Sequence, residues 1–280
     1  MRRETASHKR RRGKAATSVA AEPAWETPPE FVKARRDEVH VWRACLDVQS
    51  SHVQRLALML SADERERAER FRFQRHRDHF VAARVFLRIL IGQYLQKEPD
   101  QIQFSYNPYG KPYLAQEGNH APSFNLSHSE GLALYAVTRD REIGVDVEHV
   151  SERVDTDEVA QHHFSPSEIA SIRALPQSLR QRAFFTCWTR KEAYLKAQGN
   201  GLSAALDSFS VSLKPAEPPA LLNVQNDSEE SSRWSFLAID PDPGYVAAVA
   251  VEGRSPLLRC WEFPSEMQDL SVLQRNDPAA

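Results

Sequence analysis

The sequence predicts an α+β protein in which two similar halves pack side by side with a ligand cleft between them. Two observations lead to this prediction. The same order of elements, a strand, a short capped helix, a long helix and another strand, occurs twice along the chain. The two capping-box motifs begin at Ser61 and Ser165, and Phe80 and Phe184 share the same spacing of 104 residues. Coincidence is the alternative, because capping boxes are common, but two packed units would provide a cleft suited to a ligand.

The first half is expected to start with a strand over residues 39–48, where apolar side chains predominate. The capping box at Ser61 predicts the start of a helix, and apolar residues at helical spacing predict a long helix over 79–95. A strand over 102–106 follows and leads into a turn at 107–110, whose Asn-Pro-Tyr-Gly sequence is typical of turns.

Two adjacent strands follow, and the second half then repeats the pattern. Ser165 caps a helix that has proline at its first position, and a long helix is expected over 179–198. The glycine-rich segment 199–201 can adopt the left-handed conformation that ends a helix. The segment 215–233 is expected to be an exposed loop. The strands expected in this part of the chain are 132–138, 143–150, 209–213, 234–239, 245–251 and 257–263.

These patterns divide the chain into four segments. We expect a disordered basic extension over 1–37, a first α+β half over 38–141, a second α+β half over 142–264 and a loosely held tail over 265–280. Seven basic residues and one acidic residue fall in the first fourteen positions, followed by much Ala, Ser and Pro, so little of the extension can be buried. We expect it to be functionally silent; a nucleic-acid arm or a targeting peptide is the alternative.

The overall composition narrows the class of protein. The formal net charge is −2, which gives no electrostatic reason to expect nucleic acid as a partner. The three cysteines are far apart and have neither zinc nor disulfide spacing, which favours a reducing compartment. No apolar run reaches the roughly 18 residues of a membrane helix, and no secretory signal is visible. We therefore expect a cytoplasmic protein with no membrane partner.

Four side chains in two separate motifs are candidates for one site. The segment 144–148, if it is a strand, places the carboxylates of Asp146 and Glu148 on one face. Glu192 and Lys196 lie one helical turn apart and project from one side of their helix. Together, three carboxylates and a lysine would suit Mg²⁺ and a phosphate. Each motif alone has a simpler interpretation, a solvated strand face or a surface ion pair.

Two further motifs could contact phosphate. Ser127 and His128 lie in a segment expected to be a loop before the strand at 132–138, and a hydroxyl, an imidazole and exposed amides suit an anion. Lys111 is a cation in the turn 110–113, which alone reads as a plain turn. A hydrolase is a weak alternative for Ser127 and His128, because neighbours in sequence seldom form a nucleophile–base pair and no G-x-S-x-G motif is present.

Taken together, the motifs G-K-P-Y, F-N-L-S-H-S, G-V-D-V-E and W-T-R-K-E-A-Y-L-K-A-Q-G-N-G-L, in this order, resemble the Sfp-type 4′-phosphopantetheinyl transferases. The resemblance covers about residues 39 to 263. It implies a monomeric pseudo-dimer of α+β halves that binds coenzyme A in its cleft. It also implies Mg²⁺-dependent transfer of phosphopantetheine to a serine of an apo acyl or peptidyl carrier protein, with release of 3′,5′-ADP. An enzyme for polyketide or nonribosomal peptide synthases, a fatty-acid carrier enzyme and a lysine-pathway enzyme would all share these motifs.

The resemblance also implies roles for the four residues of the first candidate site. Asp146, Glu148 and Glu192 would hold Mg²⁺ against the coenzyme A pyrophosphate, and Lys196 would neutralise the departing phosphate. Phosphoryl transfer needs mostly positioning and charge neutralisation, which this set supplies. The carrier serine needs a base. Glu192 is the first candidate and Glu148 the second, with a water held by the cation as the alternative.

Five other residues match positions that contact coenzyme A in the family. Ser127 and His128 would meet its 3′-phosphate, Arg67 matches a basic position near that phosphate, and Lys111 and Pro112 would line the adenine side.

The chain departs from some family members in its first half. Glu64 replaces a base three residues before Arg67, and near Phe80 a hydroxyl that contacts phosphate in some members is missing. Arginines at 75, 77 and 84 are candidates to compensate.

Two rival functions use the same residues. A metal-dependent nuclease or phosphoesterase would pair its acid and lysine more often at i,i+2 on a strand, whereas here they are i,i+4 on a helix. A non-catalytic relative would hold coenzyme A or a carrier protein without transfer, and the intact set of three carboxylates and Lys196 argues against it.

Overall fold

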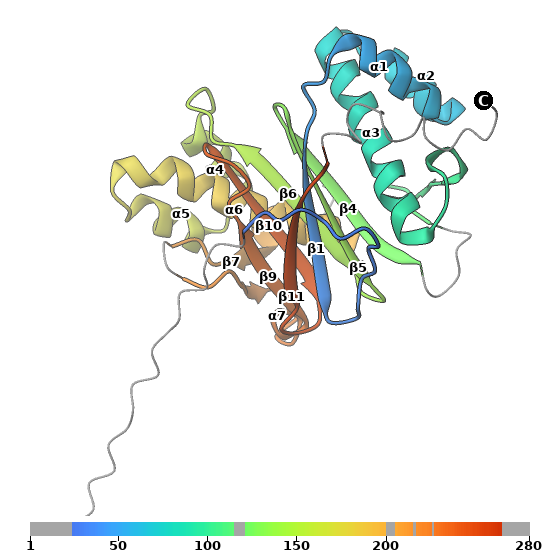
Figure 1. Cartoon of the computed structure of the whole chain (residues 1–280). Helices are drawn as coiled ribbons and strands as arrows, with labels where there is room; N and C mark the ends of the chain where they lie inside the picture. Colours follow the sequence, from blue (N-terminus) through green and yellow to red (C-terminus); the bar gives the residue numbers. More distant parts are fainter. Residues whose placement is uncertain (1–23, 115–120, 200–204, 215–216, 226, 265–280) are drawn as a thin grey trace, which may run out of the picture.

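The computed structural model of the chain describes residues 24–114, 121–199, 205–214, 217–225 and 227–264. Two β-sheets pack face to face at its centre, and one long helix covers the outer face of each sheet (Figure 1). Helices α1 to α3 lie on the side of the first sheet and α4 to α6 on the side of the second. The predicted α+β class with two packed halves is therefore confirmed.

The first sheet has the strand order β11-β1-β5-β4. Strand β1 pairs antiparallel with β5, which pairs antiparallel with β4, while β11 runs parallel to β1 on its other side. The strands are β1 (Glu38–Cys45), β4 (Pro122–Ser129), β5 (Leu132–Arg139) and β11 (Leu257–Glu262). The helices of this half are α1 (Ser50–Leu56), α2 (Ala62–Glu69) and α3 (Gln74–Leu95).

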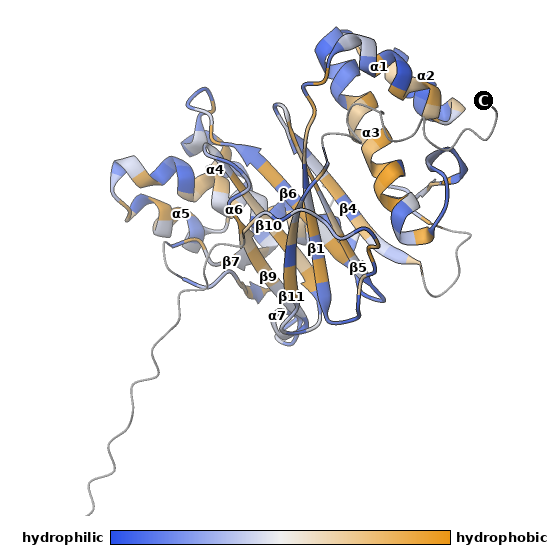
Figure 2. Cartoon of the chain, viewed as in Figure 1, coloured by the Kyte–Doolittle hydropathy of each residue, from blue (hydrophilic) through white to orange (hydrophobic). Residues whose placement is uncertain are grey.

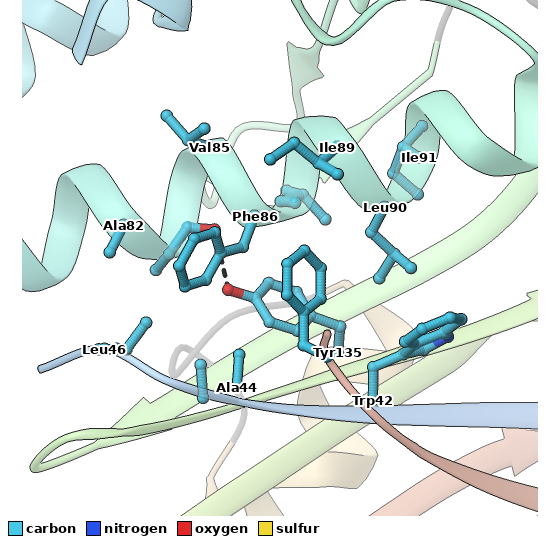
Figure 3. Close-up of a cluster of buried hydrophobic side chains, with 14 of the residues drawn as sticks. Trp42, Ala44, Leu46, Ala82, Val85, Phe86, Ile89, Leu90, Ile91 and Tyr135 are labelled. Atoms are coloured by element: carbon cyan, nitrogen blue, oxygen red, sulfur yellow. Dashed lines mark hydrogen bonds between the residues drawn. The ribbon is translucent and has the colours of Figure 1, made fainter. Parts of the chain in front are cut away.

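Helix α3 forms the core of the first half with the outer face of this sheet (Figure 3). Apolar residues dominate the helix after its polar first turns, as the colouring of Figure 2 shows. Phe86 and Leu90 of α3 meet Trp42 of β1 and Tyr135 of β5, and all four are fully buried. The Tyr135 hydroxyl donates a 3.0 Å hydrogen bond to the carbonyl oxygen of Ala83, so its one polar atom is satisfied inside the core.

The second sheet has the order β6-β10-β9, and all its pairs are antiparallel. Helix α6 lies directly on β6 at Gly144, where a Cβ atom would come 2.0 Å from the carbonyl oxygen of Ala193. Only glycine permits this approach, which brings the C-terminal turns of α6 over the strand. The elements are β6 (Ile143–His149), β9 (Trp234–Ile239), β10 (Tyr245–Glu252), α4 (Thr156–His163), α5 (Pro166–Arg173) and α6 (Gln177–Gln198).

Short elements complete the described part of the chain. Strands β2 (Ser105–Tyr106) and β3 (Pro112–Tyr113) form one hairpin, and β7 (Phe209–Val211) pairs with β8 (Leu221–Val224). The remaining helical turns are η1 (Ala57–Met59), η2 (Pro99–Gln101), η5 (Leu206–Ser208) and α7 (Glu230–Arg233). No helix in these described ranges is long and apolar enough to cross a membrane.

The predicted repeat is present in the structure. The spacing of 104 residues carries α2 onto α5, and it aligns β1 with β6 and α3 with α6 to within one residue. Both capping boxes form, at Ser61 and Ser165. In each half the capping-box glutamate is buried and paired with cations of the long helix: Glu64 with two arginines, Glu168 with Lys191.

The prediction that Ser127 and His128 lie in a loop is wrong, because these residues belong to strand β4. Asn and Ser are frequent in turns, which favoured the loop interpretation. The segment nevertheless alternates: Phe124 and Leu126 pack into the core under α3, and Asn125 lies on the opposite face. A period of two is the strand signal that the composition obscured.

Two other expectations need correction. The strand at 257–263 was expected to close the second half, but β11 joins the first sheet beside β1. The extension 1–37 was expected to be disordered throughout, whereas residues 24–37 are ordered: Val32 and Ala34 are buried, and the backbone of Glu26 bonds to β11. Residues 1–23, 265–280 and the predicted stop beyond Gly199 lie outside the described residues.

Two element boundaries also differ. Helix α3 starts at Gln74, earlier than expected, because the polar residues before its apolar stretch continue the helix. Of the strand predicted over 102–106, only Ser105–Tyr106 forms, after the 3-10 turn η2.

Candidate active site

The two sheets meet at the edges formed by β4 and β6, where no backbone ladder joins them in the described part of the chain. Side chains of β4 make the connections instead. Asn125 Oδ1 accepts a 2.9 Å hydrogen bond from the Val145 amide, and Ser127 and Ser129 bond to residues 19 or 20 positions further on. This constant spacing shows that β4 and β6 run in the same direction. The candidate residues lie along this junction.

Asp146 is the centre of the site and is only 3% exposed. Its Oδ1 accepts hydrogen bonds from the Ser127 hydroxyl at 2.9 Å and from Lys196 Nζ at 2.6 Å. Lys196 Nζ also donates to Ser127 Oγ at 3.0 Å, which closes a three-membered network between β4, β6 and α6. The second oxygen of Asp146, Oδ2, is buried and has no hydrogen-bond partner among the described residues.

Glu148 follows two residues later on the same face of β6, as the alternation predicted. Its Oε2 accepts a 2.9 Å hydrogen bond from the Ser129 hydroxyl. Burial, the largest effect, and the charge of Asp146 raise the pKa of Glu148, Ser129 and Lys196 lower it, and the resulting pKa is about 7. This carboxyl therefore titrates close to neutral pH in the metal-free protein.

Glu192 lies one turn before Lys196 on α6 and is 8% exposed. Burial, the largest effect, and the charges of Asp146 and Glu148 raise its pKa, Lys196 lowers it, and the resulting pKa is about 7. Its Oε1 is buried without a hydrogen-bond partner in the described residues. The three carboxylates, called the carboxylate cluster below, thus act on one another electrostatically, as the sequence predicted.

The carboxylate cluster has the chemistry that a hard cation requires. It supplies oxygen donors only, and two of them, Asp146 Oδ2 and Glu192 Oε1, are buried and unsatisfied. A buried, unpartnered carboxylate oxygen is costly unless something neutralises it, and Mg²⁺ would do so. Within the described ranges no three His, Cys, Asp or Glu side chains already stand in a preformed metal geometry. The donor set fits a cation by its chemistry and burial.

Ser127 and His128 occupy opposite faces of β4, because successive strand residues alternate. Ser127 joins the Asp146 network directly. His128 does not; it is exposed on the other face, and partial desolvation and the nearby charges of Lys196 and His79 lower its pKa. His79 of α3, which the sequence did not single out, lies 2.7 Å from Asp47 through its Nε2 atom. The structure therefore brings His128 near the site without a hydrogen bond to it.

Lys111 lies at this junction, whereas Arg67 belongs to α2 and Pro112 to β3. Arg67 on α2 stacks over the ring of Phe80 and, with Arg70 and Phe71, lines a cavity of about 430 Å³.

Lys111 is held by protein acceptors: its Nζ donates to the carbonyl oxygens of Ala197 at 3.0 Å and Ile143 at 3.2 Å, and it lies 3.4 Å from Glu142. Burial lowers its pKa. Pro112 is buried in β3.

Two residues of the site were missed by sequence reasoning, Asn125 and Ser129. Both lie on the face of β4 that carries Ser127 and points toward the second sheet. The alternation Asn125, Ser127, Ser129 was the available signal.

Comparisons with known proteins agree with this geometry. The family model described as "4′-phosphopantetheinyl transferase superfamily" matches residues 142–250, and the model described as "4′-phosphopantetheinyl transferase, N-terminal" matches residues 44–139. The two matches divide the chain as its two halves do.

Among curated proteins, 4′-phosphopantetheinyl transferase HetI of Nostoc sp. is 42% identical over 240 residues, which cover 85% of this chain and 98% of that protein. The 4′-phosphopantetheinyl transferase Sfp of Bacillus subtilis is 29% identical and covers 70% of this chain and 84% of its own. A solved structure of Helicobacter pylori holo-(acyl-carrier-protein) synthase in complex with coenzyme A covers 40% of this chain and 99% of its own, at 22% identity and a TM-score of 0.30. The sequence relatives, rather than this structural similarity, identify the family.

Proposed function

The chain belongs to the 4′-phosphopantetheinyl transferase superfamily, and from this premise we propose that its chemistry takes place where β4, β6 and α6 meet. The protein is a 4′-phosphopantetheinyl transferase of the Sfp type, which transfers phosphopantetheine to carrier proteins. The donor in this proposal is coenzyme A, and the acceptor is a serine hydroxyl of an apo acyl or peptidyl carrier protein. One observation carries the location: Asp146, Lys196 and Ser127 form a hydrogen-bonded network beside two buried, unpartnered carboxylate oxygens.

The carboxylate cluster, Asp146, Glu148 and Glu192, would hold Mg²⁺. When bound, this cation would offset negative charge on the pyrophosphate of coenzyme A. The protein's part is to present the oxygens: Ser127 and Lys196 fix Oδ1 of Asp146, which leaves Oδ2 for the cation. Burial of Glu192 keeps water away from its Oε1.

The carrier serine must lose its proton as its oxygen forms a bond to the β-phosphorus of coenzyme A. Glu192 is our first choice as the base, because its Oε1 has no hydrogen-bond partner among the described residues and its pKa is raised to about 7. Glu148 is the second choice, since its Oε2 is already committed to Ser129. A carboxylate that also binds the cation is a weaker base, so a water beside the cluster is the alternative.

The bond that breaks joins the same phosphorus to the oxygen of the departing 3′,5′-ADP. Lys196 is the cation on α6 beside the carboxylate cluster, and its Nζ can move its hydrogen bonds from Asp146 and Ser127 to a leaving phosphate oxygen. Positive charge placed where negative charge develops is the main contribution that a protein makes to phosphoryl transfer.

The remaining contacts concern coenzyme A itself. Arg67, at the cavity on α2, and His128, near Lys196, are proposed to meet the 3′-phosphate together with Ser127. Pro112 is proposed to line the adenine side next to Lys111. Since Lys111 Nζ already has two carbonyl acceptors, its contribution is to hold β6 and the end of α6 in place as much as to touch the nucleotide.

The proposal is tested by mixing the protein with an apo carrier protein, coenzyme A and MgCl₂ and weighing the carrier by mass spectrometry. We expect the carrier to gain one phosphopantetheine group, and EDTA to prevent the gain. Glu192→Ala should abolish the gain, whereas Glu152→Ala, which changes an exposed acid outside the cluster, should not.

The outcomes separate the rival functions. If the carrier protein is still modified in EDTA, the reaction does not need the cation and this part of the proposal is wrong. Coenzyme A binding, measured by calorimetry, with no transfer to several carrier types would identify a non-catalytic binding protein. His128→Ala should weaken coenzyme A more than dephospho-coenzyme A, and equal losses would place the 3′-phosphate elsewhere.

A further inference from the structure

Ser129 makes two hydrogen bonds across the junction of the two sheets that the proposed reaction does not use. Its Oγ donates to Glu148 Oε2 at 2.9 Å, and it accepts from the backbone N–H of His149 at 3.2 Å. Ser129 is the last residue of β4, and it is partly buried. One hydroxyl therefore links β4 both to the backbone of β6 and to a carboxylate of the cluster.

The chemistry of the two partners fixes the direction of these bonds. A backbone N–H can only donate, so the lone pair of the Ser129 oxygen must face His149. The single hydroxyl hydrogen is then free for Glu148, whose ionised carboxylate can only accept. The backbone of β6 thus orients the hydroxyl, and the hydroxyl in turn orients the carboxylate.

We propose that Ser129 is a positioning residue that holds Glu148 by Oε2 and so presents Oε1 to the divalent cation. This inference rests on the proposed function of the carboxylate cluster. Oε1 of Glu148 makes no hydrogen bond within the described part of the chain, whereas Oε2 is committed to Ser129. A flexible glutamate held by one oxygen loses little further freedom when the other oxygen binds a cation.

Ser127 shows the same arrangement at Asp146, where the hydroxyl also fixes one oxygen and the other remains unpartnered. Ser127 additionally touches Lys196 and is a candidate for contact with phosphate, so its removal would affect several functions at once. Among the described residues, Ser129 makes no hydrogen bond to Lys196, and its second bond is with the backbone N–H of His149. It therefore isolates the positioning effect.

The alternative is that Ser129 only joins the two sheets. A pair of substitutions with the same shape separates the two roles: Ser129→Thr keeps the hydroxyl, and Ser129→Val replaces it with a methyl group. Both are β-branched and suit a strand, so a difference between them reports on the hydroxyl and not on packing. Ser129→Ala adds a third, smaller variant.

The experiment measures Mn²⁺ binding by electron paramagnetic resonance, without carrier protein, alongside transfer kinetics and melting temperatures. We expect Ser129→Val to bind Mn²⁺ about 10-fold more weakly than Ser129→Thr and to have a lower kcat with an unchanged KM for the carrier. Ser129→Thr should stay close to wild type.

Equal Mn²⁺ affinities in Ser129→Val and Ser129→Thr, with only the melting temperature changed, would overturn the inference and leave a structural role. If the wild-type protein transfers phosphopantetheine in EDTA and binds no Mn²⁺, the proposed cation site is wrong. This result differs from failure of the Ser129 inference, because it is seen in the wild-type protein without any substitution. Unfolding of Ser129→Ala would leave the test intact, since it rests on the Val and Thr pair.

Discussion

The two halves of the molecule place very different side chains at equivalent positions. At a spacing of 104 residues, each of the four residues of the proposed site in the second half corresponds to a packing residue of the first half. The pairs are Asp146 with Trp42, Glu148 with Ala44, Glu192 with Arg88, and Lys196 with Gly92. The same strand–helix contact is thus made by two apolar strand residues and a neutralised arginine in one half, and by a polar site in the other.

In the first half, the equivalent contact between strand and helix consists of side chains that are packed or fully hydrogen-bonded. Trp42 and Ala44 are fully buried against α3. Arg88 is buried too, but it donates to Glu64 and to the carbonyl oxygens of Pro99 and Ile102. No carboxylate oxygen of this kind is left unsatisfied there among the described residues. The fold therefore does not require a polar strand at this place.

In the second half, the contact between β6 and α6 buries carboxylates, which is electrostatically unfavourable. Asp146 and Glu192 each bury an oxygen that has no hydrogen-bond partner in the described residues, and the charge of Asp146 raises the pKa of both Glu148 and Glu192. Sites that keep like charges close together in a dry environment are typical of function rather than of stability. The difference between the halves locates the site, because the first half is an internal control for the fold.

The largest effect is expected for Asp146→Asn, which keeps the shape of the side chain and removes its charge. Transfer should fall by about 10²–10³-fold, because a neutral amide cannot replace the carboxylate beside Lys196 and the cation. The melting temperature should stay at or above that of the wild type. Measuring the rate of carrier modification checks the prediction, and turnover within threefold of wild type would contradict the assigned site.

Lys196→Met should slow transfer by about 10²-fold, because the departing phosphate loses its cation. Met retains most of the length of the side chain, so the packing of α6 on β6 should be kept. The effect should appear in kcat and not in the KM for the carrier. An unchanged kcat would show that Lys196 only neutralises Asp146 in the resting protein.

Glu64→Gln tests the first half, because it removes the negative charge that pairs with Arg84 and Arg88. Although burial alone would raise the pKa of Glu64, Arg84 and Arg88 hold it below its ordinary value. Removing the charge leaves these buried arginines without a counter-ion, which should cost about 3 kcal/mol of unfolding free energy.

Gln can still complete a capping box, so the change isolates the ion pairs. Urea denaturation checks the loss in Glu64→Gln, and kcat of the folded fraction should be close to wild type. A strong loss of kcat without loss of stability would mean that the halves are not divided into a structural and a chemical one.

The sequence was sufficient where a local period decides the structure. The i,i+2 spacing of Asp146 and Glu148 and the i,i+4 spacing of Glu192 and Lys196 placed these side chains correctly on β6 and α6. It was insufficient at β4, because Asn125 and the two serines are polar residues that turns also favour.

The parallel pairing of β11 with β1 could not be predicted from local sequence patterns either, because the two strands are more than 200 residues apart in the sequence. The contacts of Ser129 became visible only when β4 and β6 were placed side by side.

The smallest effect should be a loss of stability as the pH rises through neutrality, caused by the carboxylate cluster of the second half. The pKa of Glu148 and of Glu192 is about 7 in the folded metal-free protein, above the ordinary value of 4.5. The folded state therefore binds protons more tightly than the unfolded state. This contribution to stability is fully present below pH 4.5 and is lost as the pH rises through 7.

In EDTA, the double variant Glu148→Gln/Glu192→Gln removes this loss because amides do not titrate. Its melting temperature should match wild type near pH 5 and exceed it by a few degrees at pH 8, whereas Glu152→Gln should follow wild type at both values. Excess MgCl₂ at pH 8 should raise the melting temperature of wild type only, because the cation then replaces the lost protons. A constant difference between the double variant and wild type at both pH values would mean that burial does not disfavour the charged form of these carboxylates. The contrast with the first half, where Arg84 and Arg88 neutralise the buried Glu64, would then lose its electrostatic basis.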